Sequence, residues 1–303
     1  MGGLIEDVLD ALKKRYIEIN GLKPFDTAMV SEKGRYYLAD LNDNLIIPMK
    51  DKHRLEFSKG AGHELKYKMR ALRSSSAMAF NLIGNGTVEI IDNNFFSKGM
   101  YTVDYEKAYN TIKQSSRKAH LDAYLYSKDN KEAIFCEMKM LEWLESPGRL
   151  SCSYLDEKKY NYSESYPVFL SVFDKIISTK TDKGYKSIFK SYDAFQILKH
   201  SMSIYNAFRE NKMPETRKAT LVNCIWELCS TERLSEKTIK KYKNKYDVHN
   251  REFDEFRAAF EPIIVLFKEI GIEFEVILLP FHEFVGTISK TNAEREKLER
   301  YYL

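Results

Sequence analysis

The spacing of apolar residues predicts helices in several parts of the chain. Residues 4–16 place apolar side chains three and four positions apart, which is typical of one face of a helix. The same reasoning predicts a helix at the end of the segment 59–81, which begins with glycines and finishes in small residues. Further helices are expected over 104–116, over 182–209 and over 253–270, where Gly271 would end the last one.

Strands are expected where apolar residues alternate with polar ones or form short β-branched runs. Such patterns cover 86–96, 119–126, 131–141, 219–228 and 274–281. Residues 20–58 are expected to form loops and short strands, and the tyrosine-rich segment 150–166 a surface insertion. Since no linker rich in Gly, Ser or Pro divides the chain, we expect one α/β domain over 1–303. Its core would span about 60–285, behind an N-terminal helical extension over 1–59.

The strands at 119–126 and 131–141 carry charged residues at positions that a buried sheet would disfavour. A two-residue turn at Asp129-Asn130, where both residues tolerate a positive φ, would pair Asp122 with Glu137 and His120 with Lys139. That register would also gather the apolar side chains on one face of the hairpin. They are Leu121, Ala123, Leu125, Ile134, Cys136, Met138 and Met140. A shift by one residue would disrupt both faces.

Two carboxylates placed opposite each other repel, and a divalent cation with oxygen ligands would relieve the repulsion. Lys139 would then lie beside the metal, where it can orient or deprotonate a water or hold an anionic oxygen. Together these groups suit hydrolysis of a phosphodiester. The alternative is a structural ion pair, in which Asp122 pairs with Lys139 or His120 on a half-exposed sheet.

Composition sets the remaining limits. The net charge of +4 and the pI of about 8.6 permit a polyanionic partner without requiring one. The four cysteines lack zinc-ligand spacing and suggest a reducing compartment. The N-terminus has acidic residues where a signal peptide would be apolar, and no apolar run reaches the length of a membrane span. We therefore expect a cytoplasmic protein without a membrane partner.

The acid on one strand and the Glu137-Met138-Lys139 triplet on the next resemble the motif of the PD-(D/E)XK nuclease superfamily. Leu121 replaces the proline of that motif, which carries no chemistry. The order of GAGHEL, RALRSSSAMAFN, AHLD, CEMKMLEW and YDAFQILKH is similar to that in a group of bacterial restriction-endonuclease-like proteins. The resemblance covers the chain from about Gly60 to the last strand.

This resemblance implies a restriction-endonuclease-like fold, with a mixed central sheet flanked by helices and bearing insertions. It implies a DNA endonuclease of restriction or defence type that uses Mg²⁺, with Mn²⁺ as a substitute, and that acts as a monomer or a homodimer. Asp122 and Glu137 would bind the metal, and Lys139 would be the catalytic lysine. The alternative is a non-catalytic nucleic-acid-binding protein of the same fold.

Glu64 would be a third, helix-borne acid at the metal, and Glu106 is its rival for that role. The resemblance also aims Gln196, and either Lys199 or His200, at the site or at the phosphate backbone. Each of these residues could equally be a solvated polar side chain on a helix.

Other candidates depend on the residues alone. Arg70 and Arg73, the serines at 74–76 around Ser75, and Asn81 could contact nucleic acid. The alternatives are close helix packing for the serines and a helix cap for Asn81. Glu142 would support the site from behind or be solvated. The lysine run over 237–246 could follow a nucleic-acid backbone, although a solvated helix face is the commoner explanation.

Overall fold

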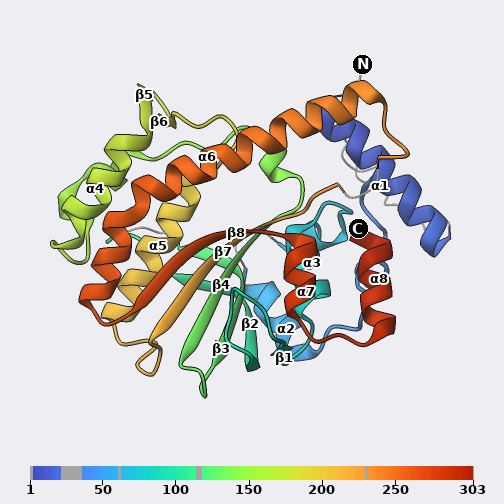
Figure 1. The fold of residues 1–303 in the computed structure, drawn as a ribbon, viewed down its shortest axis with the longest axis horizontal. Helices are drawn as coiled ribbons and strands as arrows, with labels where there is room; N and C mark the ends of the chain where they lie inside the picture. The colour runs from blue at the N-terminus through green and yellow to red at the C-terminus, as the bar shows by residue number, and fades with distance from the viewer. Residues whose placement is uncertain (1–2, 22–35, 61–62, 114–117, 229–230, 303) are drawn as a thin grey trace.

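A mixed six-stranded sheet forms the centre of the protein (Figure 1). The computed structural model describes residues 3–21, 36–60, 63–113, 118–228 and 231–302. The strands lie in the order β1-β2-β3-β4-β7-β8. The pairs β1–β2, β2–β3 and β3–β4 are antiparallel, whereas the pairs β4–β7 and β7–β8 are parallel. Their bounds are β1 Thr87–Ile90, β2 Gly99–Tyr109, β3 Ala119–Ser127, β4 Glu132–Lys139, β7 Lys218–Ile225 and β8 Glu273–Pro280.

Helices cover both faces of this sheet, and each face has its own apolar cluster. One face packs against α1 (Leu4–Asn20), α2 (Asp51–Lys59), α3 (Ser75–Ile83), α7 (Phe281–Thr287) and α8 (Asn292–Tyr302). The other packs against α4 (Ser165–Ile176), α5 (Ala194–Arg209) and the C-terminal half of α6 (Glu236–Glu269). Short 3-10 turns lie at Leu41–Asn44, Lys68–Arg70, Glu142–Leu144, Cys152–Leu155 and Glu157–Lys159. The expected α/β architecture is therefore confirmed at the level of a mixed sheet between helices.

The expected helix at 104–116 is wrong, because most of that segment belongs to β2. The side chains of Tyr101, Val103 and Tyr105 alternate inward, and β2 pairs with β1 on one side and β3 on the other. Tertiary pairing on two edges outweighs the weak helical spacing that the sequence shows here. Residues 114–117 lie outside the described part of the chain.

The expected helix over 182–209 is correct only for its second half, α5. The first half contributes to a separate two-stranded sheet of β5 (Ile177–Thr181) and β6 (Gly184–Ser187). Gly184 has a φ of +113°, which a helix cannot contain, and the side chain of Asp193 caps the start of α5. These two local signals divide the apolar pattern into a hairpin and a helix.

Helix α6 is longer than expected, and α2 is a helix that the sequence analysis did not expect. Helix α6 begins at Glu236 rather than 253, because Ser235 caps it and the lysine run continues its polar face. Residues 51–59, expected in a region of loops and short strands, form α2. The expected strands at 119–126, 131–141, 219–228 and 274–281 are confirmed with small changes in their bounds, as are the helices at 4–16 and at the end of 59–81. Of the strand expected at 86–96, only Thr87–Ile90 forms a strand, β1.

The register expected for the β3–β4 hairpin is confirmed, with Ala123 opposite Cys136 and Leu125 opposite Ile134. Its turn differs from expectation in one respect. The positive φ falls on Lys131, at +50°, rather than on Asp129 or Asn130. The ladder pairs β3 with β4 from Ser127 back to Ala123, so Asp122 and Glu137 lie just beyond its end.

One residue of the hairpin faces the opposite way from that expected. Leu121 packs in the cluster of α4, α5 and α6, whereas Ala123 packs in the cluster of α3. The ladder with β2 likewise omits Asp122 and Glu106, and Glu106 has a φ of +52°. The strands thus change faces at Asp122, because an irregularity of this kind turns the chain locally.

Asn81 ties α3 to two distant segments of the chain, one at 44–46 and one at Tyr302. Its side-chain oxygen accepts a hydrogen bond from the Ile46 amide at 2.8 Å. Its amide group donates to the Asn44 carbonyl at 2.9 Å and to the Tyr302 hydroxyl at 2.8 Å. Asn81 is buried, so these bonds use its polar atoms inside the fold rather than on a binding surface.

We expect Asn81→Ala to lower the free energy of unfolding by about 3 kcal/mol, since each of the three hydrogen bonds contributes about 1 kcal/mol. Urea denaturation measures the change, with Ser75→Ala on the same helix as the control. A denaturation midpoint equal to that of the unmodified protein would show that these bonds do not stabilise the fold.

Candidate active site

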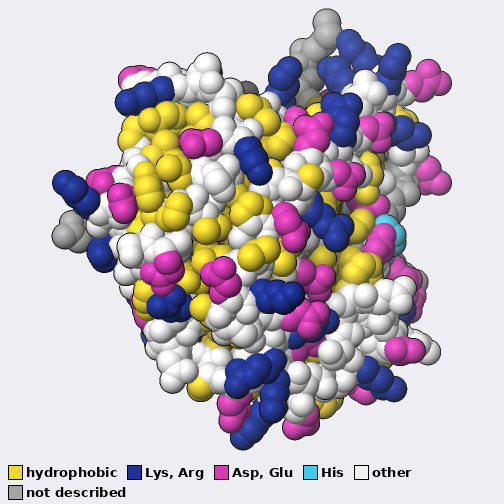
Figure 2. All heavy atoms as spheres, turned by 60° about the vertical axis from the view of Figure 1, so that its left-hand side comes forward, with side chains coloured by type: hydrophobic (Ala, Val, Ile, Leu, Met, Phe, Trp, Pro, Cys, Tyr) yellow, Lys and Arg dark blue, Asp and Glu magenta, His cyan; other side chains and the backbone are white. Residues whose placement is uncertain are grey.

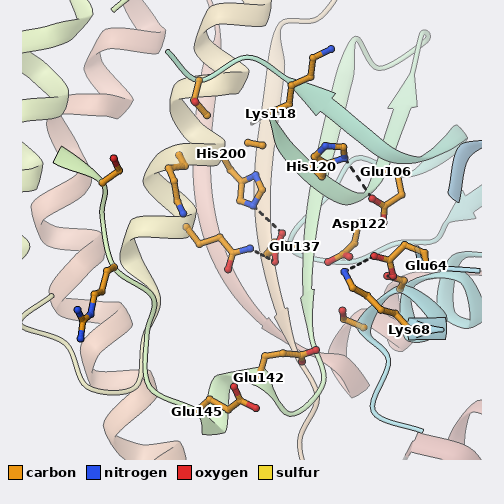
Figure 3. A pocket seen from close by; sticks show the side chains of 18 of the residues that line it. Glu64, Lys68, Glu106, Lys118, His120, Asp122, Glu137, Glu142, Glu145 and His200 are labelled. Atoms are coloured by element: carbon orange, nitrogen blue, oxygen red, sulfur yellow. Dashed lines mark hydrogen bonds and ion pairs between the residues drawn. The ribbon is translucent and has the colours of Figure 1, made fainter. Parts of the chain in front are cut away.

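A cleft of about 940 Å³ opens where the β3–β4 hairpin meets α3 and α5. Acidic side chains from separate elements reach into it, as Figure 3 shows for Asp122, Glu137, Glu64 and Glu106. Within this group, Asp122 lies between Glu137 on one side and Glu64 with Glu106 on the other. The cleft is thus organised around a group of carboxylates at the irregular point of the sheet.

Glu137 is the most enclosed of these acids, and three side chains contact its carboxylate. Lys139 Nζ lies 2.6 Å from Oε1, Gln196 donates to the same oxygen at 2.6 Å, and His200 Nε2 lies 2.9 Å from Oε2. Burial alone would raise the pKa of Glu137, but Lys139 and His200 outweigh it and hold the pKa at about 2. Glu137 therefore remains a carboxylate at neutral pH although it is buried.

Two of the three partners of Glu137, Gln196 and His200, come from helix α5, which packs on the sheet. The Asp193 side chain accepts from the Gln196 amide at 3.1 Å and fixes the start of α5. Gln196 and His200 are four residues apart, so both project from one side of the helix and contact the carboxylate. Figure 3 shows His200 pointing toward Glu137. The site thus depends on the packing of α5 against β4.

Asp122 is anchored by the backbone of the neighbouring strand. Its Oδ2 accepts a hydrogen bond from the Met138 amide at 2.7 Å, which continues the hairpin beyond the end of the ladder. Burial, followed by the charges of Glu137 and Glu106, raises the pKa of Asp122 well above its usual range. The ionised form of Asp122 is therefore costly in this arrangement unless a positive charge approaches it.

Glu64 and Glu106 complete the acidic side of the cleft. Glu64 is buried and accepts hydrogen bonds from Ser76 Oγ at 2.9 Å and from Lys68 Nζ at 2.8 Å. Glu106 lies 3.6 Å from His120 Nδ1, and burial raises its pKa. Both rivals for the third acidic position therefore line the same cleft as Asp122.

Lys139 approaches Glu137 from a smaller cavity of about 50 Å³ next to the cleft. Burial opposes the charge of its ammonium, but Glu137 and then Glu142 raise the pKa of Lys139 above the usual range. Lys139 is therefore a cation at neutral pH. The Glu142 carboxylate accepts from the amides of Met140 and Leu141 at 2.8 and 3.0 Å, so it closes the end of β4 and faces the lysine.

The donor set at this point suits a hard divalent cation. Asp122 and Glu137 supply carboxylate oxygens, the preferred ligands of Mg²⁺, and the mutual repulsion that raises the pKa of Asp122 would be relieved by such an ion. No group of three or more His, Cys, Asp or Glu side chains is arranged as ligands among the residues described. Since Lys139 contacts Glu137, a metal would have to share or replace that contact.

Of the remaining expected site residues, some line the cleft and others lie outside it. Ser75 and Lys199 line the cleft. Arg70 lies outside its lining and donates to the Ala39 carbonyl at 3.0 Å, and Asn81 makes the internal bonds described above. Arg73, expected with Arg70 to contact phosphates, lines the cleft. Sequence reasoning did not pick out the other basic side chains on the cleft walls, which are Lys68, Lys113, Lys118, Arg149 and Lys159. Scattered single lysines and arginines carry no spacing signal, so only the fold brings them together.

Compared with protein-family models, with curated proteins and with solved structures, the chain gives no match. The site is therefore interpreted from its own geometry. Within the described ranges, none of the helices combines the length and apolar character that crossing a membrane requires.

The raised pKa of Asp122 predicts that this residue reduces stability as the pH rises. The unfolded chain releases the proton above a pH of about 4, whereas the folded chain retains it, so stability falls through this range. We expect Asp122→Asn, which keeps an oxygen acceptor for Met138, to raise the melting temperature at pH 8 by a few degrees and to change it little at pH 4.

Thermal melts between pH 4 and pH 8, recorded without added metal, measure this difference. Asp129→Asn in the exposed turn of the same hairpin is the matched control. An Asp122→Asn variant that melts lower than the unmodified protein at pH 8 would contradict the interpretation of Asp122 as a destabilising charge.

Proposed function

We propose that this protein is a metal-dependent nuclease that hydrolyses phosphodiester bonds. The proposal rests chiefly on one observation: the carboxylates of Asp122 and Glu137 and the ammonium of Lys139 meet at the end of one hairpin. The arrangement of acid, acid and lysine on adjacent strands of a mixed sheet supports the PD-(D/E)XK resemblance and, with it, a restriction-endonuclease-like fold.

Each residue has a role that its surroundings support. Asp122 and Glu137 would hold Mg²⁺, with Mn²⁺ as a substitute, and the ion would polarise a phosphoryl oxygen and lower the pKa of a bound water. Because Lys139 is held as a cation, its ammonium can stabilise negative charge on a phosphate oxygen or orient the water. Gln196 and His200 position Glu137, which keeps its carboxylate fixed at the metal.

The walls of the cleft suit a polyanion. Besides the acids, lysines and arginines from several elements line it, including Lys113, Lys118 and Arg149. Elsewhere the charges are mixed: Figure 2 shows basic and acidic side chains interspersed over one face, in agreement with a net charge of only +4. A nucleic acid would therefore gain its phosphate contacts mainly at the cleft.

We take DNA as the substrate and internal cleavage as the reaction, because the restriction-endonuclease resemblance favours them. A binding protein without activity would not need to keep the acids and the lysine together. Their contacts, with Lys139 2.6 Å from Glu137 and Asp122 bonded to the strand of Glu137, favour the catalytic alternative.

Lys139→Met is expected to lower the rate of Mg²⁺-dependent DNA cleavage at least 100-fold, since it removes the charge but keeps most of the side-chain volume. Glu137→Gln should lower the rate similarly, because the amide is a much poorer metal ligand. The assay follows linearisation of plasmid DNA, and linear and single-stranded DNA and RNA are tested in parallel.

Lys128→Met, in the exposed turn of the same hairpin, is the matched control and should cleave at the unmodified rate. Circular dichroism establishes that each variant is folded. Cleavage by Lys139→Met at the unmodified rate, or no cleavage of any substrate by the unmodified protein with Mg²⁺ or Mn²⁺, would refute the proposed function.

A further inference from the structure

The hairpin of β5 and β6 stands apart from the main sheet and carries a concentration of basic side chains. In Figure 1 it lies at the edge of the molecule, beyond α4. Lys180, Lys183 and Lys186 are exposed, and the hairpin turn contributes one acid, Asp182. Three lysines against one acid within a short hairpin give it a positive charge that the protein as a whole has only weakly.

This hairpin is joined to the wall of the cleft. Leu150 and Tyr185 exchange two backbone hydrogen bonds, of 3.0 and 2.8 Å. A side chain at Gly184 would come within 2.3 Å of the Leu150 carbonyl, so the two segments approach as closely as glycine allows. The charged sequence at the tip of the hairpin is therefore held in a fixed position beside the segment that follows Gly148.

Arg149 links the hairpin directly to the cleft. Its guanidinium donates to Thr181 Oγ1 at 3.1 Å, and the same residue lines the cleft. Arg149 thus belongs both to the basic lining of the cleft, with Lys113 and Lys118, and to the contact with the hairpin. A polyanion leaving the cleft along this wall would meet positive charge outside it as well.

The three hairpin lysines have no ion pair with any residue in the described part of the chain. Lys180 Nζ lies 5.9 Å from the centre of the Tyr185 ring, a contact that leaves its charge exposed. The lysine run of α6 provides a contrast. Lys237, Lys240 and Lys241 are also exposed, but they lie on the half of α6 that reaches α1, and none lines the cleft.

We propose that the β5–β6 hairpin, together with Arg149, is a second contact for the nucleic-acid backbone, and that it holds the phosphates of the strand outside the cleft. The inference deepens the proposed function and rests on it, since a nucleic acid must first occupy the cleft. The contact is made to phosphates, so it raises affinity without selecting a base sequence. The α6 lysines form a solvated helix face and make no such contact.

Binding of a fluorescein-labelled 30-base-pair DNA tests this contact. Calcium replaces magnesium so that the DNA is not cut, and anisotropy is recorded between 50 and 200 mM salt. The variant K180A/K183A/K186A should bind about tenfold more weakly at 100 mM salt. Its plot of log affinity against log salt should lose about 2 to 3 units of slope, close to 0.9 for each lost phosphate contact.

The matched control is K237A/K240A/K241A, which removes the same charge from α6 and should bind within twofold of the unmodified protein. Equal affinity and slope for the hairpin variant and the unmodified protein would overturn the hairpin proposal and leave the nuclease proposal intact. Equal weakening by both triple variants would also overturn it, because net charge alone would then explain binding. An unmodified protein that neither binds nor cleaves nucleic acid would instead refute the proposed function itself.

Discussion

The site depends on the contacts that stabilise the ionised carboxylate of Glu137 inside the protein. Lys139, Gln196 and His200 make these contacts. An isolated carboxylate at this depth would be costly enough to take up a proton or to disrupt the packing. Its partners come from its own strand and from α5, so the charge is tolerated only when that helix is packed on the sheet. Folding and assembly of the site are therefore one event.

Asp122 is in the opposite situation, although it lies close by. Its hydrogen bond from the Met138 amide fixes its position, but Glu137 and Glu106 repel its charge. The sheet is also irregular here, since Asp122 has no ladder partner on either side and Glu106 has a positive φ. Under the proposed function, a bound cation would convert the repulsion into attraction.

Side chains of both signs line the cleft. Asp122, Glu137, Glu64 and Glu106 lie near one another, and lysines and arginines share the lining, Lys68 being paired with Glu64. Under the proposed function, the carboxylates would suit a small cation and the basic groups would suit phosphates. The basic β5–β6 hairpin, bonded to Leu150 and Arg149, adds positive charge beside the cleft.

The sequence by itself determined the local part of this arrangement. Alternation of apolar residues and a polar turn were enough to predict the register of the β3–β4 hairpin, and with it the proximity of Asp122, Glu137 and Lys139, because strand pairing across a short turn is a local matter. Tertiary structure decided the rest. Pairing on two edges made 99–109 a strand, and packing of α5 brought Gln196 and His200 to Glu137. It also turned Asn81 inward and gathered the scattered basic residues of the walls, since contacts between distant segments leave no periodic trace in the chain.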